Sequence, residues 1–235
     1  MATATLRWPV RRWLVLLACV ATAVSIAVTV GADRTGDRLP AAAAVAARHL
    51  LDTVPATPRR TAREDYQRSA FGTAWTDAVP VLGGHNGCDT RNDILRRDLT
   101  DLTLGPKGSC PQAVLGGDLR SPYTGEFIAF RRDRGAAAVQ IDHIVPLAYV
   151  WDQGGWGWPA DRRAALANDP ANLVAVDAPS NQAKSDAEPA VWMPPLRGFR
   201  CRYAIQFVGV AAAYRLALDA PSWRVLAATL DECRG

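Results

Sequence analysis

An acid and a histidine stand side by side in this sequence, at the end of an apolar run (residues 139–146, VQIDHIVP) that favours a β-strand. Residues 172–176 (NLVAV) supply a second strand-like run. Asn181 and Lys184 follow at the start of an expected helix, spaced so that they share one helix face. Two strands and a helix would thus gather one carboxylate, one imidazole, two amides and one ammonium, on Asp142, His143, Asn172, Asn181 and Lys184. Such a set could hold a divalent metal ion against a phosphodiester.

The order Asp-His, Asn-Leu and Asn-x-x-Lys-Ser resembles the HNH, or ββα-metal, nuclease motif in the variant seen in RNA-guided DNA nucleases. Four further segments extend the resemblance to secreted actinobacterial HNH proteins, which are related to the C-terminal domain of the GmrSD-type restriction endonucleases that attack modified DNA. These segments are GCDTRN at 87–92, PYTG at 122–125, ANDP at 167–170 and WMPP at 192–195. The resemblance covers roughly residues 66–233. A lone Asp-His pair would be weak evidence, whereas the ordered set is specific.

The resemblance implies a role for each of the five residues. His143 would be the general base, since imidazole titrates near neutral pH. Asp142 would be a metal ligand and Asn181 a second one, and their hard oxygens suit one Mg²⁺ or Mn²⁺ ion. Asn172 would hold the histidine loop by hydrogen bonds to backbone. Lys184 could contact phosphate, with a solvated lysine as the alternative.

From this resemblance we expect an exported, metal-dependent endonuclease that acts as a monomer. Its expected substrate is DNA, with RNA as a further substrate. The alternative is a non-catalytic secreted or surface protein that retains the HNH fold. The sequence contains no Gly-x-Ser-x-Gly and no His-Glu-x-x-His motif, so two other hydrolase classes lack their signatures.

The N-terminus has the form of an export signal. Arg7, Arg11 and Arg12 precede an uncharged apolar stretch at residues 13–30, and small residues follow it. This stretch is also long enough to span a bilayer, so residues 1–32 are a signal peptide or an uncleaved signal anchor at the outer face of the membrane. Without the three arginines, 24 basic residues face 23 acidic ones, and the net charge of +1 is no argument for DNA binding.

Four cysteines remain beyond the apolar stretch, and an even number in an exported chain predicts two disulfides. Zinc is disfavoured because no Cys-x-x-Cys pair occurs. The number of cysteines leaves three connectivities open. We expect Cys88–Cys110 and Cys201–Cys233, because bridges between sequence neighbours need the least long-range organisation before they form.

The length fits one domain at residues 61–235 behind a linker at residues 33–60, in which residues 41–51 could form a short helix. The expected fold class is α+β, a ββα core surrounded by helices. Helical segments are expected at 89–99, 147–152, 160–167, 201–218 and 221–230, with Asp177 capping the motif helix. Residues 105–117 are expected to be mostly loop, because they are rich in Gly and Pro.

Overall fold

The computed structural model describes residues 38–233, and the expected export segment at residues 1–32 lies outside this range. Residues 44–235 form one compact unit. Across residues 38–233, no helix combines the length and apolar character that crossing a membrane requires.

A β-hairpin lies at the centre of this unit. Strand β5 (Val139–His143) pairs antiparallel with β6 (Leu173–Asp177), with Asp142 opposite Val174 and His143 opposite Leu173. The helix α6 (Ala178–Lys184) follows at once and is capped by Asp177, whose side chain accepts a hydrogen bond from the Ser180 backbone amide. The strand, strand and helix expected of the ββα motif are therefore present.

Side chains alternate along the hairpin between two apolar cores. Leu173 and Ala175 belong to one core, which also contains residues of α3 (Thr90–Asp98) and of the strands β3 and β4. Val174 and Val176 belong to a larger core shared with the helices α4 and α7. Burial on both faces explains why residues 173–176 of β6 are all apolar.

The segment between the two central strands forms two short helices. These are α4 (Leu147–Asp152) and α5 (Ala160–Asn168), which match the expected bounds closely. The 3₁₀ turns η3 (Gly155–Gly157) and η4 (Pro170–Asn172) follow them, and Asp169 caps η4 by accepting from the Ala171 amide.

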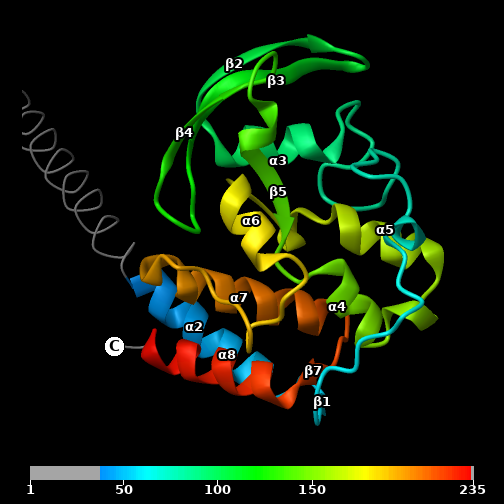
Figure 1. Cartoon of the computed structure of the whole chain (residues 1–235), viewed down its shortest axis with the longest axis vertical. Coiled ribbons are helices and arrows are strands. Elements are labelled where there is room, and N and C mark those ends of the chain that lie inside the picture. The colour runs from blue at the N-terminus through cyan, green and yellow to red at the C-terminus, as the bar shows by residue number, and fades with distance from the viewer. Residues whose placement is uncertain (1–37, 234–235) are drawn as a thin grey trace, which may run out of the picture. The chain divides into compact units, whose positions relative to one another are not determined.

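The expectation of loop at residues 105–117 was wrong. Strands β2 (Thr100–Lys107) and β3 (Cys110–Arg120) form a long hairpin, to which β4 (Phe127–Arg131) adds a third antiparallel strand. Figure 1 shows this curved sheet on α3, with the helices α7 and α8 beyond β5 at the other end. Pro106 is accommodated because β2 is an edge strand, where a missing amide donor leaves no ladder bond unmade.

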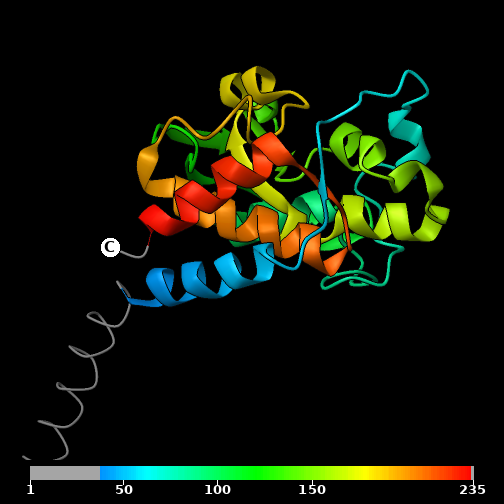
Figure 2. The same cartoon turned by 90° about the horizontal axis from the view of Figure 1, so that it is seen from below.

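Helices near both ends of the chain build the larger core. They are α2 (Arg38–Leu51), α7 (Arg197–Ala213) and α8 (Ala220–Glu232), and Figure 2 shows the part of α2 after Ala43 beside α7 and α8. Ala44, Ala47 and Leu51 are buried in this core. The expected linker at residues 33–60 thus contains a helix that packs on the fold, and β1 (Ala56–Thr57) pairs with β7 (Leu218–Asp219). The compact unit begins at Ala44, ahead of the expected residue 61.

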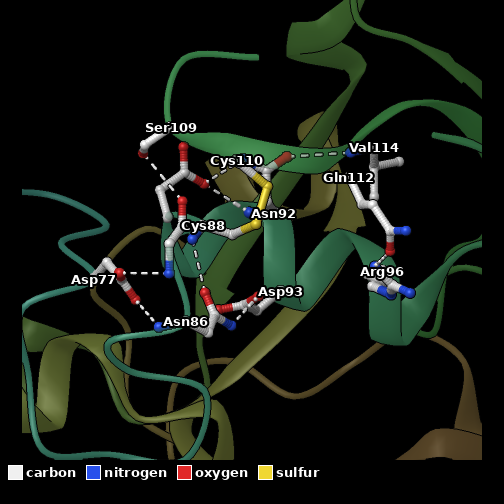
Figure 3. The surroundings of a disulfide bond; sticks show 12 residues. Asp77, Asn86, Cys88, Asn92, Asp93, Arg96, Ser109, Cys110, Gln112 and Val114 are labelled. Atoms are coloured by element: carbon white, nitrogen blue, oxygen red, sulfur yellow. Dashed lines mark hydrogen bonds between the residues drawn. A yellow bond between two sulfur atoms is a disulfide. The ribbon is translucent and has the colours of Figure 1, made fainter. Parts of the chain in front are cut away.

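Both expected disulfides are confirmed. Cys88–Cys110 joins the residues before α3 to the start of β3, and Cys201–Cys233 joins α7 to the residue after α8. Figure 3 shows the first bridge among hydrogen bonds that fix its loop, including those from the Asn86 and Gly87 amides to the Asp77 carboxylate. The α+β fold class with two disulfides is therefore confirmed.

Candidate active site on the central hairpin

Alternation along β5 sends Asp142 and His143 to opposite faces of the hairpin. Asp142 faces α6, whereas the His143 ring turns toward α5. Because the pair ends the strand, both side chains still line one pocket of about 390 Å³, which we call the Asp142 pocket. Asn181 and Asp186 line it as well.

The histidine is buried and its tautomer is fixed. His143 Nε2 lies 2.9 Å from the carbonyl oxygen of Ala167. A carbonyl oxygen can only accept, so Nε2 carries the proton and Nδ1 keeps its lone pair. Trp75 stacks on the imidazole, with ring centroids 5.7 Å apart and planes 10° from parallel.

The pKa of His143 is lowered to about 3, well below the near-neutral value expected of an imidazole. Burial is the largest cause; the hydrogen bond to Ala167 opposes it, and the positive charges of Arg68 and Lys184 act in the same direction as burial. The ring is therefore neutral at ordinary pH, with one nitrogen able to take a proton.

Asn172 fastens the chain that follows the histidine. Its Oδ1 accepts from the Val145 amide at 2.8 Å, and its Nδ2 donates to the Val145 carbonyl at 3.3 Å. The backbone carbonyl of Asn172 also accepts from the Ile144 amide. Asn172 is completely buried. These are the backbone hydrogen bonds that the resemblance implied for this residue.

The helix α6 lies over the face of β5 that carries Gln140 and Asp142. Asn181 and Lys184 share one face of this helix. Asn181 Nδ2 donates to Gln140 Oε1 at 2.7 Å, and Lys184 Nζ lies 2.8 and 3.0 Å from the two carboxylate oxygens of Asp142. Two side-chain pairs, Gln140 with Asn181 and Asp142 with Lys184, therefore join the strand β5 to the helix α6.

Lys184 is not placed for the phosphate contact expected of it. The side chain is fully buried, and Nζ also donates to the His143 carbonyl at 2.7 Å. Burial lowers the pKa of Lys184, while Asp142 opposes that shift. Three acceptors in the interior satisfy the three ammonium donors, so this lysine holds Asp142 and the end of β5 in place.

The Asp142 carboxylate has a second donor, the Tyr123 hydroxyl. Tyr123 is fully buried, and burial together with Asp142 raises its pKa well above the usual range, so the hydroxyl remains a donor. In the sequence, Tyr123 stands out only as part of the PYTG segment, and nothing there indicates a role for it. No spacing rule connects it to Asp142, because the contact depends on how the loop before β4 packs.

The donors that could hold a metal ion are one carboxylate and one amide. Because Gln140 binds Asn181 Nδ2, Asn181 Oδ1 is turned away from that bond, and no donor in residues 38–233 contacts it. Asp142 and this amide line the same pocket. Two hard oxygens fit Mg²⁺ or Mn²⁺, ions that keep several water ligands. The Lys184 ammonium offsets the charge of Asp142, which weakens the attraction of these two donors for a cation.

Arg68 is a further residue that the sequence analysis missed. It begins the 3₁₀ turn η1 (Arg68–Phe71), is exposed, and lines the Asp142 pocket. Within residues 38–233, no carboxylate forms an ion pair with it. No sequence signal distinguished Arg68 from other surface arginines, because its place beside His143 depends on a segment some 75 residues away in the chain.

Two comparisons with known proteins found similarity to this chain. Residues 89–217 match the model of a family described as GmrSD restriction endonucleases, C-terminal domain. The chain is also 32% identical over 216 residues to an uncharacterized secreted protein of Arthroderma benhamiae. The aligned region covers 91% of this chain and 97% of that protein. No solved structure matches the chain.

Proposed function

Because the chain belongs to the family of the GmrSD restriction endonuclease C-terminal domain, we propose that it is an exported endonuclease that hydrolyses DNA phosphodiesters with His143 as general base and one divalent metal ion. The observation that carries the proposal is the His143 geometry. Donation from Nε2 to the Ala167 carbonyl leaves Nδ1 free to accept a proton, and His143 is one of the residues that line the Asp142 pocket.

Each residue of the site would have its own role in hydrolysis. His143 Nδ1 takes the proton of the water that attacks phosphorus, a task typically worth about 10²–10⁴ in rate. Arg68 faces the same pocket and offers its guanidinium to the phosphate oxygens. Lys184 and Tyr123 hold the Asp142 carboxylate, and Asn172 holds the loop beyond His143.

Asp142 and Asn181 would hold the metal ion. When bound there, Mg²⁺ or Mn²⁺ supplies Lewis-acid stabilisation of the phosphate and its leaving oxygen. Two hydrogen bonds orient the protein groups that would hold the metal ion: Gln140 orients the Asn181 amide, and Lys184 orients the Asp142 carboxylate.

Export is supported by three independent features. The N-terminal sequence has the form of an export signal, and the relative from Arthroderma benhamiae is described as secreted. Two disulfides are typical of chains that fold in oxidising compartments.

One observation favours a second candidate function, a non-catalytic secreted protein that retains the fold. Lys184 already neutralises Asp142, so the site keeps its ion pair with no metal bound. Under this alternative, Asp142 and Lys184 would be structural partners alone.

A plasmid assay separates the two functions. The purified protein is incubated with supercoiled DNA in Mg²⁺, in Mn²⁺ or in EDTA, and with structured RNA in parallel. We expect nicking and linearisation with metal and none in EDTA. Intact plasmid under all three conditions, from a protein shown to be folded, would reject the endonuclease and favour the non-catalytic alternative.

A further inference from the structure

A second pocket reaches His143 from the side of α5. It has a volume of about 240 Å³ and is lined by residues of the segment 68–75 together with Leu147, Ala167 and Asn168. We call it the Trp75 pocket. It shares Arg68, His143 and Leu147 with the Asp142 pocket, so the two pockets meet at the proposed general base and at Arg68.

The chemistry of the Trp75 pocket differs from that of the Asp142 pocket. No carboxylate lines it, whereas Asp142 and Asp186 line its neighbour. Its walls are aromatic and aliphatic, from Phe71, Trp75 and Leu147. The hydroxyl-bearing Ser69 and Thr73 are exposed at its edge. A flat apolar ligand with hydrogen-bonding groups on its edge fits such walls.

The segment that lines the Trp75 pocket contains a residue whose backbone conformation is energetically unfavourable. Trp75 has a φ of 57°, in the left-handed region that bulky residues rarely adopt. The Trp75 carbonyl accepts from the Thr90 amide at 3.1 Å, and the Thr90 hydroxyl donates to the Thr76 carbonyl at 3.1 Å. Backbone strain of this kind persists where the surroundings enforce it and gathers at ligand sites. The pocket wall is therefore fixed by the fold before any ligand binds.

We propose that the Trp75 pocket is a subsite for an unpaired nucleobase of the nucleotide next to the phosphate held at Arg68 and His143. The inference rests on the proposed nuclease function and adds a substrate class to it. A base that is paired and stacked in a duplex cannot enter a pocket beside the general base, whereas a base in a single strand or an opened duplex can. The protein therefore prefers single-stranded or locally opened nucleic acid.

Binding in EDTA tests the subsite without relying on catalysis. A labelled single-stranded DNA and its duplex are titrated with the protein, and anisotropy is measured. Ser69→Phe and Ala74→Phe each fill the Trp75 pocket from a different position. Ala78→Phe is the matched control, because Ala78 is exposed three residues after Trp75 and lines neither pocket. Thermal unfolding of each variant verifies that it is folded.

We expect both filled variants to bind single-stranded DNA about 10- to 100-fold more weakly than the wild type, the range that loss of one base stack gives. Their duplex binding, and all binding by Ala78→Phe, should stay unchanged. An abasic nucleotide moved along the single strand should weaken wild-type binding at one position and have no effect in the filled variants. Folded filled variants that bind single strands as the wild type does would overturn the subsite.

The two proposals fail in different ways. A wild-type protein that shows the abasic pattern in EDTA but cuts nothing with Mg²⁺ or Mn²⁺ keeps the subsite and loses the endonuclease function. A protein that cuts DNA with metal, while its filled variants show unchanged preference between single strand and duplex, keeps the endonuclease function and loses the subsite.

Discussion

His143 combines three properties of a general base: a fixed tautomer, a neutral ring and a place on a pocket wall. We expect His143→Ala to lower the rate of plasmid cleavage by about 10²–10⁴, the usual effect of losing a general base. His49→Ala is the matched control, because His49 is exposed on α2. Cleavage at the wild-type rate by a folded His143→Ala protein would contradict the mechanism.

The depressed pKa of His143 also predicts how stability depends on pH. The folded state holds this ring neutral down to about pH 3, whereas the unfolded chain protonates it near its ordinary pKa of 6.5. Stability is thus present above pH 6.5 and is lost as the pH falls toward 3. Between pH 7.5 and 5, the wild type should lose about 2 kcal/mol more unfolding free energy than His143→Gln. Urea titrations at both pH values measure this, and equal losses would refute the prediction.

Lys184 and Asp142 form a buried ion pair, in which each charge needs the other. We expect Lys184→Met to lower the unfolding free energy by about 3–5 kcal/mol, because it leaves the Asp142 carboxylate without its cation. Asp142→Asn added to Lys184→Met should restore much of the loss, since the double variant buries no charge. Denaturant titration of the two single variants and the double variant gives the coupling. Additive losses would mean that the pair contributes nothing to the fold.

At the scale of elements, local sequence rules succeeded where an element carries its own signals. The helix α4 was expected at 147–152 and α6 after an Asp177 cap, and both are present. The β2–β3 hairpin was missed although Gly108-Ser109 marks a two-residue turn with Gly108 at a φ of 57°. Glycine and proline in the two strands suggested loop instead. At Gly117 a Cβ would lie 3.0 Å from the Thr100 carbonyl oxygen, so the close approach of the two strands favours glycine there.

The sequence predicted which residues gather at the candidate site, but not which contacts each of them makes. Asp142, His143, Asn172, Asn181 and Lys184 do gather around one hairpin. Which of them face a pocket depends on packing between segments far apart in the chain, and no spacing rule encodes that. Burial of Lys184 and the places of Tyr123 and Arg68 follow from such packing, so a single sequence could not supply them.

Asn172 links the start of β6 to the chain beyond β5, so its effect belongs to the hairpin as a unit. Asn172→Ala leaves the amide and the carbonyl of Val145 without their side-chain partner in a fully buried position. We expect a loss of about 1–3 kcal/mol in unfolding free energy. Cleavage should fall further than stability explains, because the chain next to His143 is released. Denaturant titration and cleavage, both at a temperature where the variant is folded, measure the two effects.

Over the whole molecule, the proposed site lies where two apolar cores meet. The β5–β6 hairpin contributes alternate side chains to each core. Cys88–Cys110 fastens the loop between Trp75 and α3, which follows the segment that lines the Trp75 pocket, to the three-stranded sheet. Cys201–Cys233 joins the helices α7 and α8, and neither cysteine lines either of the two pockets.

This arrangement predicts that the two bridges have separable effects. Closing loops of 22 and 32 residues is worth about 3–4 kcal/mol each in the chain-entropy model, so either Cys→Ser pair should lower the melting temperature markedly. Removing Cys201–Cys233 should leave cleavage by the folded protein unchanged. Removing Cys88–Cys110 should also weaken binding of single-stranded DNA, because the wall that carries Trp75 loses its anchor. Calorimetry and anisotropy on the two double-serine variants test both effects, and equal single-strand binding by both variants would show that the first bridge supports only stability.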